Sequence, residues 1–268
     1  MSKVFHIYGD NIVECTRTLQ YILNGFPVKT IRQSFVNITT PRFCIETSSE
    51  EFHFIFFPGT NATRWNKDIY KEFVLERGGM LKEGADALIT EVTNDNEEIP
   101  IIAIEFSAAL PAGNNAWQRS GRALSLSQAG IPYFYIVHLG GKEYKKENNQ
   151  LATRFLNPAL PLSFSLKSLT SPIPSIFVYS EAPEADDFYR NKFSNCYGEE
   201  IFSSILYKVI QSESYEEELR ILQKKNTEFL KTRTNLIKSP EYNAKDYDRI
   251  LESKAPYDAL IEVTKEKN

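Results

Sequence analysis

The sequence predicts an α/β protein with a mixed central β-sheet flanked by helices and a helical C-terminal region. Over the first 140 residues, apolar runs typical of strands alternate with amphipathic helical runs, as expected of a sheet covered by helices. From Glu199 onward, apolar residues recur mainly at helical spacing. With 42% hydrophobic and 25% charged residues, the composition is that of an ordinary globular chain.

The elements of the first half follow from period and stop signals. Apolar residues at helical spacing predict the first helix, and glycines at 78–79 and 130 end the next two helices. The run "IPYFYIVHL" is almost continuously apolar, which favours a fully buried strand. We therefore expect strands over 3–8, 43–47, 52–59, 85–92, 99–107 and 131–139, with helices over 11–24, 66–78 and 114–129.

The second half divides by composition. Residues 142–150 are highly charged, which predicts an exposed loop. Residues 151–180 are rich in Pro, Ser and Leu, so we expect short strands and irregular structure there, with "SIFVYS" as one strand. The polar stretch after it is typical of turns. A boundary near residue 195 is expected between a core over 1–195 and a helical region over 196–268.

Charge and cysteine content exclude several classes. A net charge of −4 carries no global signature of nucleic-acid binding, although the local distribution of Lys and Arg is what decides. The three cysteines have no CxxC spacing, which indicates reduced thiols and no zinc motif. The chain shows no signal peptide and no apolar run long enough for a membrane span, so we expect a cytoplasmic protein. The three histidines lie in strand-like runs and are interpreted as sheet residues.

Two acidic residues mark the candidate site. Asp86 opens the strand over 85–92, and Glu105 lies 19 positions later, near the end of the next strand. A hairpin would bring both carboxylates to one end of the sheet. Mg²⁺ prefers hard oxygen ligands, and one or two carboxylates with a backbone carbonyl suffice to hold it. Bound there, such an ion can promote phosphodiester hydrolysis.

This stretch resembles the PD-(D/E)XK nuclease superfamily. Ala85-Asp86 matches the "PD" pair, and Glu105-Phe106-Ser107 matches the acid-x-lysine triplet with a serine in place of the lysine. The likeness covers about residues 5–140, because a helix with an acidic residue precedes the hairpin, and a helix and a buried strand follow it. The resemblance implies a restriction-endonuclease-like core, Mg²⁺ as cofactor and Asp86 and Glu105 as metal ligands.

Each acid also has a structural interpretation. Glu14 on the first helix could complete the metal site, but Asn11 and Glu14 also have the spacing of a capping box. Asp86 could close a turn. Glu105 follows "IPIIAI", where an unpaired carboxylate would be costly, and a salt bridge with Arg119 or Arg122 would explain it as well as a metal would.

Ser107 is the departure from the family pattern. The family's lysine orients or deprotonates the attacking water and stabilises developing charge, and a serine cannot supply that charge. The function could move to a neighbouring element. Gln118 on the following helix fits best, since a glutamine lines the site in part of the superfamily, whereas Lys82 is expected to be a solvated loop residue.

Basic residues near the motif suggest a nucleic-acid contact. Arg64 and Lys67 flank a tryptophan in a loop, and Arg119 and Arg122 share one face of the helix after the hairpin. Both groups could instead serve structure, the loop by burying its tryptophan and the arginines by pairing with the acids.

These observations predict a Mg²⁺-dependent endodeoxyribonuclease acting on double-stranded DNA, such as a type II restriction or phage-defence enzyme or its cleavage domain. The helical region would serve DNA recognition, formation of a homodimer, or attachment to a further recognition domain or subunit. The alternative is a catalytically silent DNA-binding or partner-binding module that keeps the fold, which the missing lysine favours. The sequence has no GxSxG, P-loop or GxGxxG motif that would support another enzyme class.

Overall fold

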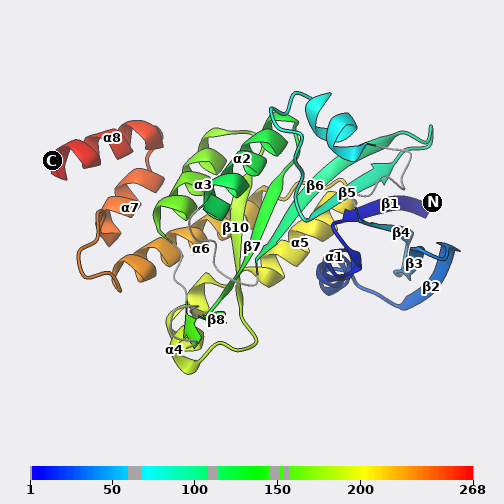
Figure 1. The fold of residues 1–268 in the computed structure, drawn as a ribbon, viewed down its shortest axis with the longest axis horizontal. Helices are drawn as coiled ribbons and strands as arrows, with labels where there is room; N and C mark the ends of the chain where they lie inside the picture. Colours follow the sequence, from blue (N-terminus) through cyan, green and yellow to red (C-terminus); the bar gives the residue numbers. More distant parts are fainter. Residues whose placement is uncertain (1, 60–67, 108–113, 145–150, 154–156, 268) are drawn as a thin grey trace. The chain divides into compact units, whose positions relative to one another are not determined.

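The computed structural model describes residues 2–59, 68–107, 114–144, 151–153 and 157–267 (Figure 1). It shows an α/β protein with an eight-stranded mixed sheet, helices, and a helical C-terminal region, which confirms the predicted class. Within these residues, no helix combines the length and the apolar character needed to cross a bilayer.

The sheet contains strands from most of the chain. Its order is β10-β7-β6-β5-β1-β4-β3-β2. It is mixed because β1 pairs with β4 in parallel and with β5 antiparallel. The strands are β1 (Ser2–Gly9), β2 (Thr30–Asn37), β3 (Thr40–Glu46), β4 (Glu51–Pro58), β5 (Ala87–Val92), β6 (Glu98–Ser107), β7 (Tyr133–Leu139) and β10 (Ser175–Glu181). A separate two-stranded pair consists of β8 (Lys142–Tyr144) and β9 (Leu151–Thr153).

The helices lie before, between and after these strands. They are α1 (Ile12–Gly25), α2 (Asn114–Gln128), α3 (Ala159–Thr170), α4 (Asp187–Lys192), α5 (Glu199–Ile210), α6 (Glu216–Thr234), α7 (Ala244–Leu251) and α8 (Pro256–Lys267). Two short elements are the π-helical turn η1 (Lys71–Leu75) and the 3₁₀ turn η2 (Ser194–Cys196).

The structure differs from the sequence prediction at several elements. Residues 142–144, expected in an exposed loop, form the strand β8, and of the helix expected over 66–78 the described residues show the short turn η1. Residues 159–170 form the helix α3 instead of short strands and irregular structure. Most of this helix is buried, so its sequence lacks the amphipathic period by which a helix is recognised. The strand β2 was not expected, because all eight of its residues are exposed and it lacks a buried alternate face. Residues 187–192, expected as a turn, form the short helix α4, which the side chain of Asp186 caps.

Two compact units are built from interleaved segments of the chain. Unit 1 comprises 1–106, 121–134 and 200–218, and unit 2 comprises 107–120, 135–199 and 219–268. The sequence places a boundary near residue 195, but α5, which follows that point, packs within unit 1.

The core of unit 1 lies on the sheet face that carries α1 and α5. Phe26, at the end of α1, packs edge-to-face on Phe52 of β4 and on Tyr207 of α5, with ring centroids 5.0 and 4.9 Å away. Gly25 allows α1 to approach α5, because a Cβ atom there would come 2.1 Å from the carbonyl oxygen of Ser203. The opposite face of the sheet meets η1, where Phe73 contacts Tyr8 of β1.

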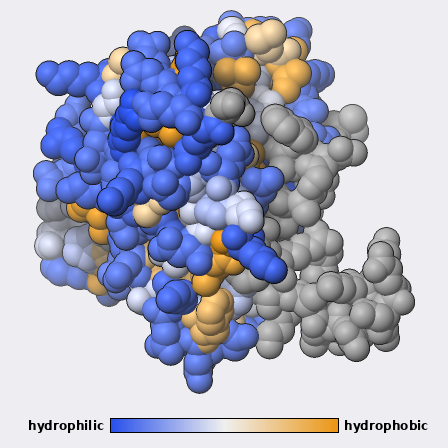
Figure 2. All heavy atoms as spheres, turned by 90° about the vertical axis from the view of Figure 1, so that its left-hand side faces the viewer, coloured by the Kyte–Doolittle hydropathy of each residue, from blue (hydrophilic) through white to orange (hydrophobic). Residues whose placement is uncertain are grey.

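The core of unit 2 is aromatic and aliphatic. Phe229 of α6 stacks on Tyr179 of β10 at 4.2 Å, and the amide of the buried Asn226 donates to the backbone carbonyl of Phe177. Seen from the side of α7 and α8, the surface is mostly hydrophilic, with apolar side chains in small areas (Figure 2). Leu169 and Ile261 are exposed large apolar residues of this unit. The helices α7 and α8 are amphipathic, because their buried apolar residues form one cluster with residues of α3 and α6.

A buried acidic network lies on the η1 face of unit 1. Glu98 of β6 accepts hydrogen bonds from the hydroxyls of Tyr8 and Thr90, both at 2.9 Å, and its Oε2 lies 3.2 Å from Nδ1 of His6. Burial alone would raise the pKa of Glu98, but His6 and the two hydroxyls outweigh burial and lower the pKa to about 2. The charged form of Glu98 therefore stabilises the fold.

We expect the stability contributed by Glu98 to be full above about pH 4.5, its ordinary pKa, and to fade as the pH falls toward about 2. Replacing Glu98 with glutamine should lower the free energy of unfolding at pH 7 by about 2 kcal/mol, the typical contribution of hydrogen bonds to a charged group. The difference from wild type should shrink toward pH 2. Urea unfolding at several pH values measures it, with Glu97→Gln in the exposed turn as control. A difference that does not change with pH would contradict the assignment.

Candidate active site

The ends of three neighbouring strands in unit 1 carry acidic residues. β5 and β6 are antiparallel, with Ala87 opposite Ile104, and β1 lies on the other side of β5 with Gly9 opposite Ala87. One step further along this register stand Asp10, Asp86 and Glu105. The predicted hairpin is therefore present, and it brings the two acids of the motif to the same end of the sheet, as expected.

Two hydrogen bonds donated by backbone N–H groups hold this end together. A carboxylate oxygen of Asp86 accepts from the backbone N–H of Phe106 at 2.8 Å, and the backbone carbonyl of Asp86 accepts from the N–H of Asp10 at 3.0 Å. These contacts tie the first residue after β1, the residue before β5 and the end of β6 into one corner. Asp10 was not singled out from the sequence, because only the pairing of β1 with β5 places it there.

Glu105 is completely buried and pairs with Arg122. The two carboxylate oxygens lie 3.2 and 3.5 Å from the guanidinium Nη1, and Nε of Arg122 donates to Glu83 at 3.1 Å. Burial opposes the charge of the guanidinium, but the carboxylates of Glu105 and Glu83 outweigh it and raise the pKa of Arg122. Of the two salt bridges considered from the sequence, the described contacts thus include the one with Arg122.

The strand period explains why Arg122 reaches Glu105. The ring of Phe106 faces α1, since Arg17 lies over it at 5.1 Å and Tyr21 stacks on it at 6.4 Å. Successive side chains of a strand point to opposite faces, so Glu105 points away from α1 and toward α2. The helix α1, which carries Glu14, and the carboxylate of Glu105 therefore lie on opposite faces of the sheet.

Glu14 lies in the first turn of α1. The side chain of Asn11 caps this helix by accepting from the N–H of Val13, but the reciprocal half of the capping box does not form. The carboxylate oxygen Oε2 of Glu14 is buried and has no hydrogen-bond partner within the described part of the chain. Burying a carboxylate oxygen without a partner costs free energy, so this oxygen is expected to bind a cation or a water molecule.

The other predicted site residues are distributed as follows. Ser107 is buried at the end of β6, and Gln118 is exposed on α2. The guanidinium of Arg119 lies over the ring of Tyr135 at 5.5 Å, within unit 2. Lys82 forms an ion pair with Asp68. Arg64 and Lys67 lie outside the described residues.

The acidic residues at the strand ends do not form a compact ligand set in this structure. Among the described residues, the group of three side chains whose ligand atoms all lie within 4.8 Å of one another is Cys44, Glu51 and His53, and not the acids at the strand ends. An open pocket of about 470 Å³ lies beside Asp10 and offers room for a ligand. It is lined by Asp10, Asn11, Ile12, Ile38, Thr39, Pro41, Pro58 and Gly59.

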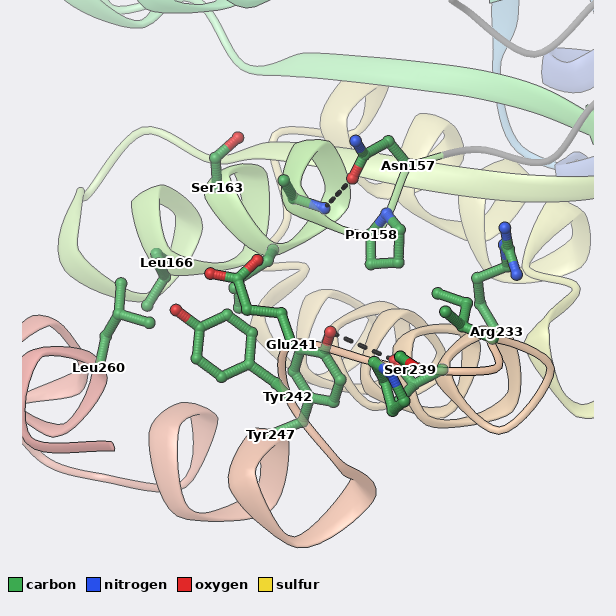
Figure 3. A pocket seen from close by; sticks show the side chains of 15 residues that line it. Asn157, Pro158, Ser163, Leu166, Arg233, Ser239, Glu241, Tyr242, Tyr247 and Leu260 are labelled. Carbon is green, nitrogen blue, oxygen red and sulfur yellow. Dashed lines mark hydrogen bonds between the residues drawn. The ribbon is translucent and has the colours of Figure 1, made fainter. Parts of the chain in front are cut away.

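A second pocket, of about 570 Å³, lies within unit 2 between α3, the end of α6, α7 and α8 (Figure 3). The rings of Tyr242 and Tyr247 line it together with Arg233 and Glu241. The hydroxyl of Tyr247 accepts from Thr234 at 3.2 Å. Among the described residues that line it there is no thiol, no imidazole and no pair of carboxylates, and such a lining suits the binding of a small molecule better than hydrolysis.

The corner at the ends of β1, β5 and β6 is therefore the candidate active site. It combines the acidic residues Asp10, Asp86 and Glu105 with the half-buried guanidinium of Arg122. In comparisons with known proteins, no family model matches the chain, and no curated protein or solved structure matches it either.

Proposed function

We propose that this protein is a Mg²⁺-dependent endonuclease that hydrolyses phosphodiester bonds of double-stranded DNA. The observation that carries the proposal is the register of β5 and β6, which brings Asp86 and Glu105 together at the ends of adjacent strands. The order of elements around them, a helix before the hairpin and a helix and a buried strand after it, supports a restriction-endonuclease-like core.

The donor atoms at this corner fit Mg²⁺. They are the carboxylate oxygens of Asp86 and Glu105, which come from adjacent strands and are hard donors of the kind that Mg²⁺ prefers. Asp86 and Glu105 would hold the ion, with Asp10 beside them, whereas Glu14 lies on α1 on the other face of the sheet and would reach the ion only around the strand ends. When bound, the ion would act as a Lewis acid and activate water.

Arg122 is our candidate for the charge that Ser107 cannot supply. Its guanidinium lies 3.2 Å from Glu105, so a cation from α2 stands beside the second acid of the motif. There it can orient Glu105 and offset negative charge on a phosphate, as a lysine does in the family. Gln118 remains a candidate for orienting water, and Arg119, Arg64 and Lys67 for contacts with the DNA backbone.

The alternative is a catalytically silent module that binds DNA or a partner protein. One observation favours it: Glu105 is completely buried and already paired with Arg122, which in turn pairs with Glu83. In that case the acids only maintain the fold, and the helical C-terminal region carries the binding. In the nuclease, that region would serve DNA recognition, a homodimer or attachment to a further subunit, as in a restriction or phage-defence enzyme.

Cleavage assays distinguish the two. Phage and plasmid DNAs of varied sequence are incubated with the protein and Mg²⁺ or Mn²⁺. The near-isosteric variants Asp86→Asn and Glu105→Gln should each lose cleavage by roughly a hundredfold or more, because each removes negative charge that holds the ion. Glu97→Gln, an exposed acid in the β5–β6 turn, is the matched control, and thermal melts confirm that the variants fold.

Two results would support the silent module instead. One is the absence of metal-dependent cleavage by the wild-type protein. The other is cleavage by Asp86→Asn and Glu105→Gln at the rate of the Glu97→Gln control.

A further inference from the structure

A second cluster of metal-ligating side chains lies on the outer strands of unit 1. In the register of β2, β3 and β4, Arg32 stands opposite Cys44, and Cys44 stands opposite His53. Glu46 and Glu51 face each other one row further along the same face, because residues two apart share a face. A thiol, an imidazole and carboxylates are thus placed side by side by backbone pairing alone.

Three of these side chains have the geometry of a ligand set. The ligand atoms of Cys44, Glu51 and His53 all lie within 4.8 Å of one another. Cys44 and His53 are each 8% exposed and fixed by the sheet, whereas the Glu51 side chain is 37% exposed and leaves access from solvent. Thiolate and imidazole are soft and borderline ligands that select Zn²⁺ over Mg²⁺, and a carboxylate is the third ligand type that Zn²⁺ accepts.

A positive charge already occupies the edge of this cluster. Nη2 of Arg32 lies 3.3 Å from the sulfur of Cys44 and 3.1 Å from Oε2 of Glu51, and it also pairs with Glu46 at 2.6 Å. The sulfur of Cys44 and the carboxylates of Glu46 and Glu51 therefore already surround a cation. Because the Arg32 side chain is 60% exposed, it can move into solvent, or pair with Glu46 only, when a metal ion binds to Cys44 and Glu51.

The contacts of His53 argue against a nucleophilic cysteine. Nε2 of His53 lies 2.6 Å from Oε1 of Glu51, and Nδ1 accepts a hydrogen bond from Nε of Arg42 at 3.3 Å. In a cysteine hydrolase, one ring nitrogen must face the thiol while the other is held by an orienting group. Here both ring nitrogens are engaged by other residues, so His53 is not arranged to take the proton of Cys44.

We propose that Cys44, Glu51 and His53 form a Zn²⁺ site, with Arg32 as a competing cation built into the sheet. On binding, the sulfur of Cys44 releases its proton to solvent and coordinates the metal. Nε2 of His53 becomes a ligand while Nδ1 carries the ring proton, so Arg42 gives up its hydrogen bond to Nδ1. Three protein ligands leave the fourth tetrahedral position for water. The metal would link β3 to β4 and stiffen this edge of the sheet.

Cobalt spectroscopy tests the site. Metal-free protein is titrated with Co²⁺, which replaces Zn²⁺ in tetrahedral sites and gives a thiolate-to-cobalt absorption band in the near ultraviolet. We expect one equivalent of Co²⁺ to produce this band and Zn²⁺ to displace it. Cys44→Ser should abolish the band. His53→Gln and Glu51→Gln should weaken Co²⁺ binding by about a hundredfold or more, since even indirect supports of a metal site contribute about 10- to 100-fold.

Two further variants make the test specific. Arg32→Gln removes the competing cation and should strengthen Co²⁺ binding about tenfold, a result that a merely structural network would not produce. Cys196→Ser, which changes another buried thiol, is the matched control and should bind like wild type. The absence of a thiolate band in the wild type, or a band that persists in Cys44→Ser, would overturn the proposal.

The Zn²⁺ site is independent of the proposed nuclease centre. Asp86→Asn should retain the cobalt band, and Cys44→Ser should retain any Mg²⁺-dependent cleavage. Failure of one proposal is therefore distinguishable from failure of the other.

Discussion

Replacing Arg122 with methionine is expected to lower the free energy of unfolding by about 3–5 kcal/mol, the usual cost of removing one partner of a buried ion pair. Glu105 is completely buried, and the change leaves its carboxylate without the guanidinium 3.2 Å away. Methionine retains most of the apolar stem, so loss of packing contributes little. Urea unfolding at pH 7 measures the difference.

The second change of a double-mutant cycle separates charge from shape. Glu105→Gln in the Arg122→Met background removes the buried charge and should recover a large part of the loss. Arg77→Met is the control: this exposed arginine follows η1, its Nε donates to the backbone carbonyl of Ala129 at 3.4 Å, and its loss should cost at most about 1 kcal/mol. If Arg122→Met destabilised no more than this control, the ion pair would not support the site. The rate of DNA cleavage by the Arg122→Met variant shows separately whether Arg122 also supplies the charge of the missing lysine.

Replacing Phe202 with alanine is expected to destabilise the protein by about 3–5 kcal/mol, the cost of emptying a buried aromatic site. Phe202 of α5 is fully buried, with its ring 5.4 Å from that of Tyr21 on α1 and 5.1 Å from that of Phe134 on β7. The result would show that α5 belongs energetically to the sheet of unit 1, although it follows the expected boundary near residue 195.

Thermal and urea unfolding measure the effect of this substitution. Phe188→Ala is the matched control, because this ring on α4 is 45% exposed and its loss should cost at most about 1 kcal/mol. A loss below about 1 kcal/mol for Phe202→Ala would mean that α5 docks loosely and that residues 196–268 behave as a separate region.

Local patterns were enough to predict most of the first half of the fold. Strands such as β5, β6 and β7 are dense in apolar and β-branched residues, and α1 has both a helical period and a capping asparagine. Elements without such a contrast were missed. α3 is mostly buried and β2 is exposed on both faces, so neither shows the alternation between buried and exposed residues on which sequence reasoning depends.

The candidate sites show the same limit in another form. Asp86 and Glu105 could be paired in advance because one hairpin joins them, so their register follows from a short turn. Arg119 and Arg122 could not be distinguished as partners of Glu105 from the sequence, since both lie on one helix, and only the tertiary packing shows that Arg122 reaches it. Cys44 and His53 are nine positions apart with no recognisable motif, and they meet only because β3 and β4 pair in one register.

By itself, the sequence determined the α/β class, the acidic hairpin and the helical character of the C-terminal region, because these depend on periodicity and turns within short stretches of chain. Only the tertiary structure decided that Arg122 neutralises Glu105, that Asp10 joins the acidic corner, that α5 belongs with unit 1 and that Cys44, Glu51 and His53 form a cluster. Each of these depends on contacts between residues distant in the chain or on strand register. Such contacts are set by the free energy of burying whole surfaces, which no local pattern encodes.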